Sequence, residues 1–350
     1  MGDDKVKRIG IRVDANEIIA TGHVSRCLAI AEALRRTGQC PVFICADECP
    51  GFLIEQKGYE FFSLQSDWKN MEEEIASLQK LVEQQNIGIL FVDSYYVTKS
   101  YLKKMHALTK VVYMDDLGKD VYDVDAIVCY ANYYKDFRLE GRYSSKVRIF
   151  QGIKYAPLRT TFSNLPLKEI SPAVKKIIVL SGGTDPYDFL ERFSEKILKS
   201  SLYETLEIIY VICGRYYKKY NELARKFGEN SKYRFFKAVE DLEQYMLLAD
   251  VAITAAGVTA YELCAAGVPA ITYVMADNQR KNAESFHKDG LMEYAGDLRT
   301  DPVLNKIVEL LNGKYQDYSY RKEVSNAMKK RVDGKGSEHV AKVLLDILQD

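Results

Sequence analysis

Three things are scarce in this chain of 350 residues: net charge, long apolar runs and histidine. Its 49 Lys and Arg residues balance 49 Asp and Glu residues, so the chain as a whole attracts neither nucleic acid nor an anionic membrane. No apolar run approaches the roughly 20 residues that span a bilayer, and no signal-peptide apolar region follows the charged N-terminus. We therefore expect no nucleic-acid partner and no membrane insertion, and any anion site must be local.

Cysteine is present but gives no disulfide framework, since the seven residues are an odd number. Cys45 and Cys49 lie close together, but no matching Cys or His pair follows to complete a zinc site. Four other cysteines stand in apolar patterns, where a reduced thiol behaves as a small hydrophobe: Cys27, Cys129, Cys213 and Cys264. We therefore expect a reducing, cytoplasmic location, with neither a structural disulfide nor a structural metal. No cofactor is expected either.

Short β-rich runs alternate with helical patterns along the chain. Residues 23–36 have apolar side chains at helical spacing, and residues 87–92 form an apolar run broken only by Gly88, as in a buried parallel strand. Further strands are predicted at residues 7–13, 41–45, 59–64, 111–114, 126–129, 176–180, 206–213, 234–238, 251–255 and 269–274. This alternation predicts an α/β fold, in which parallel sheets carry helices on both faces.

The length and the pattern predict two doubly wound, Rossmann-like domains that face a cleft. The first domain spans residues 1–160, and the second spans residues 175–350 and includes the C-terminal helices. Residues 160–174, with two prolines and mixed polar side chains, are the predicted linker. The helical patterns at residues 301–311 and 336–348 are amphipathic, so we expect both helices to pack within the second domain.

The loop after the first predicted strand carries Gly22 and His23, where a helix begins. Ligands of parallel sheets bind outside the carboxyl ends of the strands, and a helix N-terminus favours anions. The positive end of the helix dipole disfavours a cationic imidazole, so His23 suits a general base at neutral pH. From spacing alone, a histidine that only caps or packs the helix is the commoner case. The other histidines lie in helical or surface contexts and are interpreted as structural: His106, His287 and His339.

Two glycine loops in the second half also follow predicted strands. Gly257 opens a helix whose N–H groups can hold a diphosphate, and Glu262, about one turn in, can accept hydrogen bonds from ribose hydroxyls. The loop Ser181-Gly182-Gly183-Thr184-Asp185 could approach phosphates or the sugar. The structural alternatives are a carboxylate that merely complements the helix start and a tight turn between strand and helix.

Four further polar stretches were weighed. Residues 93–96 suit the hydroxyls and apolar faces of a sugar, and the amides in residues 277–280 could orient a hydroxyl or a water. Taken alone, each stretch is more often a helix cap or a polar loop. Asp123-Val124-Asp125 has the spacing of metal-dependent sugar-nucleotide enzymes, but it precedes its strand, at the wrong end for a ligand. Asp115-Asp116 stands at the favourable end, and is interpreted as a substrate-side or structural pair rather than a metal site.

Taken in order, these blocks resemble a known family. They are Asp14…Gly22-His23-Val24-x-Arg26-Cys27-Leu28-Ala29, Asp93-x-Tyr95, Asp115-Asp116, Gly152-x-x-Tyr155-Ala156-x-Leu158-Arg159, Ser181-Gly182-Gly183-Thr184-Asp185, Ala256-Gly257-x-Thr259-x-x-Glu262 and Asn278-Gln279. The pattern covers nearly the whole chain and is similar to the UDP-sugar hydrolases of pseudaminic acid biosynthesis, which are related to spore-coat polysaccharide proteins. That family resembles the MurG-type glycosyltransferases, so the resemblance implies the GT-B fold. The first and fourth blocks are its more specific parts.

The resemblance also implies a reaction: hydrolysis of UDP-2,4-diacetamido-2,4,6-trideoxy-β-L-altropyranose to UDP and the free sugar, without a metal. His23 matches the family's general base. Tyr95 and Asn278 match positions near the sugar, and Glu262 matches the ribose contact. The full set of implied substrate-binding residues is Asp14, Gly22, Arg26, Tyr95, Tyr155, Arg159, Gly183, Thr184, Gly257, Thr259, Glu262, Asn278 and Gln279. The partner is then a small-molecule UDP-sugar. No feature decides the oligomeric state, and a monomer is the working expectation.

Two other functions fit parts of the pattern. A GT-B glycosyltransferase would use the same donor site but move the sugar to an acceptor other than water. A lipid acceptor usually calls for an exposed apolar or basic patch on the first domain, to which Phe52-Leu53 could contribute. A non-catalytic protein that binds sugar nucleotides would keep the loop at residues 257–262 but has no need of a histidine at position 23, so His23 argues against it.

Overall fold

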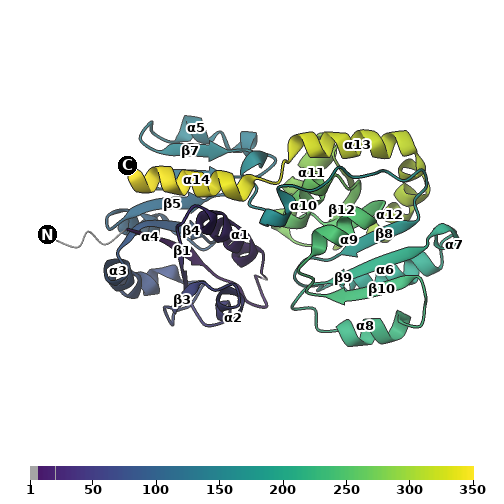
Figure 1. Cartoon of the computed structure of the whole chain (residues 1–350), viewed down its shortest axis with the longest axis horizontal. Helices are drawn as coiled ribbons and strands as arrows, with labels where there is room; N and C mark the ends of the chain where they lie inside the picture. Colours follow the sequence, from purple (N-terminus) through teal and green to yellow (C-terminus); the bar gives the residue numbers. More distant parts are fainter. Residues whose placement is uncertain (1–6, 20) are drawn as a thin grey trace. The chain divides into compact units, whose positions relative to one another are not determined.

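The computed structural model describes residues 7–19 and 21–350, which form two compact units (Figure 1). Unit 1 comprises Met1–Thr160 and Gly334–Asp350, and unit 2 comprises Thr161–Asp333. Each unit is a parallel β-sheet covered by helices, so the α/β prediction is confirmed. Among the described residues, no helix is long and apolar enough to cross a membrane.

Unit 1 is built on a seven-stranded sheet of order β3-β2-β1-β4-β5-β6-β7 in which every neighbouring pair is parallel. The strands are β1 (Arg8–Val13), β2 (Val42–Cys45), β3 (Glu60–Ser63), β4 (Ile87–Asp93), β5 (Lys110–Met114), β6 (Ala126–Cys129) and β7 (Arg148–Gln151). The central strands are fully buried runs of Ile, Val, Leu and Phe, as expected for a sheet that is covered on both faces.

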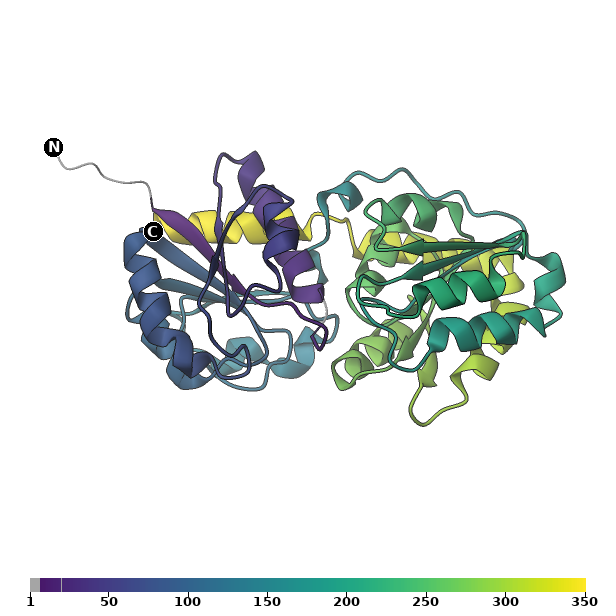
Figure 2. The ribbon, with the colours of Figure 1, turned by 90° about the horizontal axis from the view of Figure 1, so that it is seen from below.

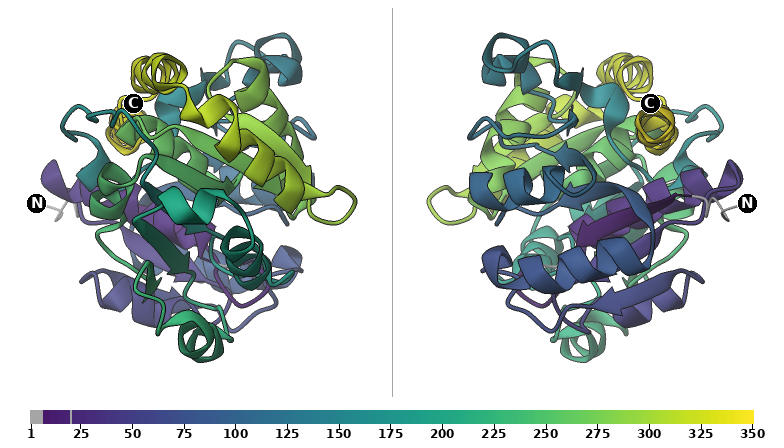
Figure 3. Two further views of the ribbon diagram at one scale, coloured as in Figure 1. Left: turned by 90° about the vertical axis from the view of Figure 1, so that its right-hand side faces the viewer. Right: turned by 90° about the vertical axis from the view of Figure 1, so that its left-hand side faces the viewer.

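The helices of unit 1 divide between the two faces of its sheet, as the right panel of Figure 3 shows. One face carries α1 (Gly22–Arg36) and α14 (Gly336–Gln349), which pack against each other. The other carries α3 (Ile75–Gln84) and α4 (Lys99–His106). Shorter helices complete the unit: α2 (Gly51–Glu55), α5 (Leu139–Arg142) and the 3-10 turns η1 (Met71–Glu74), η2 (Tyr134–Phe137) and η3 (Ile153–Tyr155); η4 (Thr160–Phe162) leads into unit 2.

Unit 2 has a six-stranded parallel sheet of order β10-β9-β8-β11-β12-β13. Its strands are β8 (Lys176–Leu180), β9 (Ile208–Cys213), β10 (Tyr233–Lys237), β11 (Val251–Ala255), β12 (Ala270–Val274) and β13 (Glu293–Asp297). Its helices are α6 (Phe189–Leu198), α7 (Leu202–Thr205), α8 (Tyr220–Phe227), α9 (Leu242–Leu248), α10 (Val258–Ala266), α11 (Asp277–Lys288), α12 (Val303–Asn312), η5 (Lys314–Gln316) and α13 (Tyr318–Arg331). The main core joins α6, α8 and α12 to one face of the sheet.

The expected assignment of the last helix to the second domain is wrong, because α14 belongs to unit 1 (Figure 2, in yellow). It packs on α1 and β4. A Cβ on Gly336 would lie 1.9 Å from the carbonyl oxygen of Ala156, so the helix start fits only as glycine. Ser337 Oγ donates a hydrogen bond to the carbonyl of Leu158 at 2.5 Å. An amphipathic pattern predicts that a helix packs, but it does not say against which sheet.

The predicted linker, residues 160–174, is likewise not a separate connection, because the contacts divide the chain directly after Thr160. Phe162 and Val174 are buried. The fully buried Arg321 donates hydrogen bonds to the carbonyl oxygens of Ser171 and Pro172, at 2.8 and 3.0 Å. The segment is therefore fastened along unit 2, and its prolines mark an extended course rather than a hinge.

Candidate functional site

The strand order places one topological switch point in each sheet. In unit 1 the chain runs from β1 outward to β3 and then returns to β4 on the other side of β1. In unit 2 it runs from β8 outward to β10 and returns to β11 on the other side of β8. Ligands of doubly wound sheets bind outside the carboxyl ends of the strands at these points. The loops after β1 and β4, and after β8 and β11, are therefore the places to look for chemistry.

At the switch point of unit 1, His23 and Asp93 form a close pair. His23 is the second residue of α1, and Asp93 is the last residue of β4. Nδ1 of His23 lies 2.7 Å from Oδ1 of Asp93. Because a carboxylate can only accept, this contact favours the tautomer with the proton on Nδ1 and leaves the lone pair on Nε2. The imidazole is thus held in the form that a general base requires.

Arg26 fastens the same carboxylate from one turn further along α1. Its Nε donates to Oδ2 of Asp93 at 2.6 Å, and its Nη2 donates to Oδ1. Nη2 also lies 3.0 Å from Nδ1 of His23. Both nitrogens are donors when Nδ1 carries the proton, so they share Asp93 Oδ1 as their acceptor. Positions 23 and 26 lie on one face of the helix, which is why both side chains reach the end of β4.

The charge of Arg26 decides the ionisation of Asp93. Burial of the carboxyl group works against ionisation, but the positive charge of Arg26 and the hydrogen bonds from Arg26 and His23 outweigh it and hold the pKa of Asp93 well below its usual range. Asp93 therefore stays an acceptor for His23 at neutral pH. Burial raises the pKa of the Cys27 thiol, whose Sγ lies 3.4 Å from Asp93 Oδ2, so this cysteine is a weak donor rather than a nucleophile.

Tyr95 and Asp116 extend the cluster from the loops after β4 and β5. The ring of Tyr95 packs edge to face on the imidazole of His23, with ring centres 4.5 Å apart. Its hydroxyl donates to Oδ2 of Asp116 at 3.1 Å, and Arg26 Nη1 donates to the same oxygen at 2.9 Å. Arg26 Nη1 also contacts the hydroxyl of Tyr130 after β6. The structure thus brings together three of the predicted site residues: His23, Arg26 and Tyr95.

Asp14 belongs to a different, buried network in unit 1. Its Oδ2 accepts from Arg12 at 2.6 Å, and its Oδ1 accepts from the backbone N–H of Ala46 at 2.8 Å. Arg12 is fully buried and also forms two hydrogen bonds with Glu74. Both oxygens of Asp14 are therefore engaged in tying β1 to the loop after β2, and its predicted contact with substrate stays a prediction.

The block with Tyr155 and Arg159 lies at the start of α14 rather than in the His23 cluster. The ring of Tyr155 faces the rings of Phe150 and His339, with centres 6.0 and 6.1 Å apart. Between Tyr155 and Arg159 lie Ala156, whose carbonyl oxygen packs against Gly336, and Leu158, whose carbonyl oxygen accepts from Ser337. The specific Tyr-Ala-x-Leu-Arg pattern therefore serves the docking of α14, and substrate binding by its two ends remains a prediction.

At the switch point of unit 2, the loop after β8 is a compact turn. Gly182 adopts a φ of +78°. A Cβ on Gly214, which follows β9, would lie 2.1 Å from the carbonyl oxygen of Gly182. Asp185 accepts from the backbone N–H groups of Phe189 and Leu190, both at 2.9 Å, and so caps α6. The glycines allow this close approach of two loops. Gly183 and Thr184 are half-buried beside it.

The loop after β11 is more open. Gly257, the N-cap of α10, has no side chain with which to cap the first turn. Among the described residues, no atom outside its immediate chain neighbours lies within 4 Å of the position a Cβ would take. A helix N-terminus that has no side-chain cap and has room beside its first residue is suited to a diphosphate. Glu262 is buried one turn further in, while Thr259 is half-buried at the start of the helix.

Asn278 and Gln279 lie in the first turn of α11, after β12. Asn278 is exposed. Gln279 accepts a hydrogen bond from the backbone N–H of Met275 at 3.0 Å and so caps the turn. β11 and β12 are neighbours in the sheet, so these amides and the Gly257 loop stand at one edge. The structure therefore places them on the ligand side of unit 2 without assigning them a contact.

The Asp-x-Asp stretch is engaged by a histidine at the opposite edge of the unit 1 sheet. His106 Nδ1 lies 2.9 Å from Asp123, and its Nε2 lies 3.3 Å from Asp125. Asp125 also accepts from the backbone N–H of Val111 at 2.7 Å. Within the part of the chain that the structure describes, no three His, Cys, Asp or Glu residues gather in a way that could hold a metal ion.

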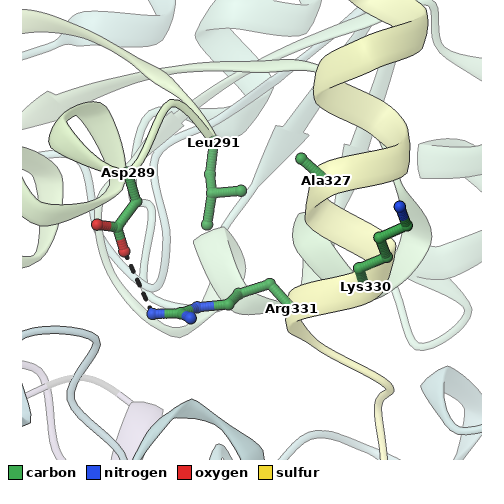
Figure 4. A pocket seen from close by; sticks show the side chains of 5 residues that line it. All are labelled: Asp289, Leu291, Ala327, Lys330 and Arg331. Carbon is green, nitrogen blue, oxygen red and sulfur yellow. Dashed lines mark hydrogen bonds and ion pairs between the residues drawn. The ribbon is translucent and has the colours of Figure 1, made fainter.

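A cavity of about 450 Å³ is open on unit 2, but it lies at the wrong edge for these loops (Figure 4). Asp289 and Leu291 precede β13, so they stand at the amino end of that strand. Arg331 closes one side through an ion pair with Asp289 at 3.4 Å. The other residues that line the cavity are Ala327 and Lys330 of α13. We assign it no part in the site.

Three members of the His23 cluster are not among the predicted site residues: Asp93, Asp116 and Tyr130. In the sequence, Asp116 is part of the Asp115-Asp116 pair, and Asp93 is part of a polar loop and of the block Asp93-x-Tyr95, without an assigned role at His23. A charged residue that ends a buried apolar strand beside the first strand is the signal that could have marked Asp93. Tyr130 has no such signal, because tyrosine is abundant in this chain, at 25 residues.

Comparison with known proteins adds a family match in unit 2. Residues 177–335 match the Glycosyltransferase family 28 C-terminal domain. The spore coat polysaccharide biosynthesis protein SpsG of Bacillus subtilis is 23% identical over 351 residues, covering 97% of this chain and 98% of SpsG. The uncharacterized protein MJ1062 of Methanocaldococcus jannaschii is 21% identical over 290 residues, or 80% of this chain, and the match spans only 58% of the length of MJ1062.

Solved structures resemble the whole chain. MurG of Acinetobacter baumannii superposes with a TM-score of 0.68 at 13% identity, covering 97% of this chain and 99% of MurG. A structure of S. aureus MnaA with UDP gives a TM-score of 0.66 at 14% identity, covering 98% of both chains. With two parallel α/β sheets and these neighbours, the chain has the GT-B fold, as predicted. Such low identities establish the fold alone.

Proposed function

We propose that this protein is a UDP-sugar hydrolase in the synthesis of a surface polysaccharide or a related glycan. The observation that carries the proposal is the His23–Asp93 pair, with 2.7 Å between Nδ1 and Oδ1, at the switch point of unit 1. It leaves Nε2 as a base among buried polar groups. The glycosyltransferase-type match in unit 2 and the polysaccharide role in the name of SpsG support a nucleotide-sugar substrate.

The two units have different parts in this proposal. Unit 2 binds UDP, with the diphosphate at the N-terminus of α10 and the ribose at Glu262, as the open Gly257 loop supports. Unit 1 supplies the base. Nε2 of His23 takes a proton from water, the water oxygen bonds to the anomeric carbon, and the bond from that carbon to the diphosphate oxygen breaks. UDP leaves with the bonding electrons, and the helix N–H groups stabilise its charge.

For the sugar we propose a 2,4-diacetamido-2,4,6-trideoxy hexose, with the β-L-altropyranose as the first candidate. This part rests on the resemblance of the sequence blocks, to which Tyr95 and Asn278 contribute. The reaction as proposed needs no metal, because the helix terminus takes the role that a divalent cation plays at other diphosphates. We further propose that the remaining substrate-binding residues act as the resemblance implies, namely Asp14, Gly22, Arg26, Tyr155, Arg159, Gly183, Thr184, Thr259 and Gln279.

A glycosyltransferase is the second candidate, and the match to the family 28 glycosyltransferase domain favours it. It would use the same base and the same nucleotide site, with an acceptor hydroxyl in place of water. The difference between the two candidates lies only in the attacking oxygen.

Acceptor-free turnover separates these candidates. The purified protein is incubated with the UDP-sugar named above, with and without excess EDTA, and UDP is followed by ³¹P NMR. The hydrolase predicts stoichiometric UDP and free sugar at the same rate in both samples. UDP release only after an acceptor is added would replace the hydrolase by the transferase. A loss of turnover in EDTA alone would overturn the metal-free mechanism.

A further inference from the structure

Asp116 is held by one of its carboxylate oxygens only. Oδ2 accepts from Arg26 Nη1 at 2.9 Å and from the hydroxyl of Tyr95 at 3.1 Å. Oδ1 is buried and has no hydrogen-bond partner among the described residues. The residue as a whole is 7% exposed. An acceptor that is buried without a partner destabilises the fold, so such an oxygen in the predicted ligand-binding region calls for an explanation.

The neighbouring carboxylate shows what a structural aspartate does in this loop. Asp115 uses its Oδ1 to accept from the backbone N–H groups of Leu117 and Gly118, at 3.2 and 2.8 Å. Its Oδ2 is, like Oδ1 of Asp116, buried without a hydrogen-bond partner among the described residues. Asp115 nevertheless shapes only its own loop, because its hydrogen bonds are made to that loop and not to the His23 cluster. Asp116 instead makes both of its side-chain contacts to residues around the base. The two adjacent carboxylates therefore have different tasks, although both follow β5.

Asp116 is connected to the base by two routes. Through Tyr95 it supports the ring that packs against His23. Through Arg26 it is joined to Asp93, which holds Nδ1 of His23. A substrate that places its reacting carbon near Nε2 of His23 brings the rest of its sugar among these same side chains. An ionised carboxylate oxygen there accepts a hydrogen bond but cannot donate one.

We propose that Asp116 is a specificity-determining residue whose Oδ1 accepts a hydrogen bond from a donor group of the sugar, an acylamino N–H or a hydroxyl. Its Oδ2 meanwhile keeps Tyr95 and Arg26 in place. This inference rests on the proposed function, since it assigns the sugar to the His23 cluster. It selects sugars that present a donor at this position, because an acceptor group there would face a carboxylate and leave two acceptors opposed.

Asp116→Asn tests the contact with little change of shape. The amide oxygen can replace Oδ2 as acceptor for Arg26 and Tyr95, which leaves the NH₂ group where Oδ1 stood. That group cannot accept, so the affinity for UDP-2,4-diacetamido-2,4,6-trideoxy-β-L-altropyranose should fall about 10- to 100-fold. Affinity for UDP alone, which lacks the sugar, should stay within about 2-fold. Isothermal titration calorimetry measures both affinities in a His23→Ala background, so that the UDP-sugar is not hydrolysed during the titration, and thermal unfolding shows whether each variant is folded.

Asp115→Asn is the matched control, and we expect it to leave both affinities unchanged. Loss of sugar affinity in this control but not in Asp116→Asn would move the contact to Asp115 and overturn the proposal. An unchanged UDP-sugar affinity in a folded Asp116→Asn variant would overturn it too, because Oδ1 then makes no hydrogen bond with the sugar. Equal loss of UDP and UDP-sugar affinity would mean that the residue is structural.

A crystal structure of the wild-type complex tests the same contact without a substitution. It should place a nitrogen or hydroxyl oxygen of the sugar within about 3.2 Å of Oδ1 of Asp116; a sugar without that contact contradicts the proposal. The outcomes also separate this inference from the hydrolase. A wild type that binds the UDP-sugar more tightly than UDP but releases no UDP removes the hydrolysis and leaves the contact. A wild type that does not distinguish the two ligands overturns both.

Discussion

The two switch points differ in the groups that stand at the strand ends. In unit 1 the ends of β1 and β4 are filled with charged side chains that bind one another, centred on Asp93 with His23 and Arg26. In unit 2 the ends of β8 and β11 carry glycines, and Gly257 faces open space. The first is a pre-organised side-chain site suited to moving a proton. The second is a backbone site suited to an anion. Such a site needs space beside the backbone N–H groups and no reactive side chain.

The largest effect is expected where the side-chain site loses its orienting carboxylate. Asp93→Asn removes the negative charge and turns one of the two accepting oxygens into an NH₂ donor, so the proton position on His23 is no longer fixed and kcat should fall about 10²- to 10⁴-fold. The loss of charge opposite Arg26 should also lower the free energy of unfolding by about 1.5–3 kcal/mol. Steady-state kinetics and urea unfolding check the two effects. Near-normal kcat in a folded variant would show that Nδ1 needs no carboxylate.

Asp93 also contributes to how the free energy of unfolding depends on pH in the acid range. The pKa of Asp93 is lowered in the fold, so its contribution is present above the ordinary carboxyl pKa, about 3.9, and is lost as the pH falls toward the folded value. Asp93→Asn has nothing to protonate. The stability difference between wild type and variant, measured by urea unfolding at several pH values, should therefore shrink as the pH falls below about 4; a difference that stays constant contradicts the assignment.

Gly336 and Gly257 differ in the space around the position that a Cβ would take. A Cβ on Gly336 would lie 1.9 Å from the carbonyl oxygen of Ala156, so Gly336→Ala should destabilise unit 1 by about 3 kcal/mol. Gly257→Ala meets no atom within 4 Å among the described residues and should change the free energy of unfolding by less than about 0.5 kcal/mol. Thermal unfolding of both variants is the test, and equal stability of the two would contradict the packing of α14 on unit 1.

The backbone site should respond to charge and not to bulk. Gly257→Asp places a carboxylate at the N-terminus of α10, where it caps the helix but repels a diphosphate, so UDP affinity should fall about 10- to 100-fold. Gly257→Asn has nearly the same size without the charge and should keep most of the affinity. Titration calorimetry with UDP distinguishes them. Equal affinities in the two variants would place the diphosphate elsewhere.

The smallest effect is expected at Asp115. Burial raises the pKa of this carboxyl group, so the ionised form costs stability above the folded pKa and costs nothing below the ordinary one. Asp115→Asn keeps an acceptor for the loop and should slightly raise the free energy of unfolding at pH 7. The gain should vanish near pH 3. Urea unfolding at both pH values checks the sign, and a variant less stable than wild type at pH 7 contradicts it.

The fold was open to prediction because it depends on pattern. Buried strands such as β4 are near-continuous apolar runs, and glycines mark the turns after β8 and β11. The edge strands β7 and β13 were missed. β13 reads Glu-Tyr-Ala-Gly-Asp, which has no apolar run, because it is only half-covered at the end of the sheet. The final helix was placed in the wrong unit, since its partner lies far away in sequence.

The site was predictable only in part. His23 stands at a helix start after a strand, which points to a ligand edge from the sequence alone. Its partner Asp93 comes 70 positions later, and only the order of β1 and β4 in the sheet brings them together. Asp14 has the position of a ligand residue, yet both its oxygens are used by the buried network around Arg12. Pattern gives the edge of the sheet, whereas side-chain pairing decides which residues are available.

The central claim is that His23 is the base for a reaction with water, and one measurement tests it directly. UDP release from the UDP-sugar is followed without acceptor for wild type and His23→Ala, and UDP affinity is measured for both by calorimetry. The account predicts that kcat falls about 10²- to 10⁴-fold, while the dissociation constant for UDP stays within about 2-fold. Normal turnover by His23→Ala, with UDP bound equally well, would contradict it and reduce His23 to a buried partner of Asp93.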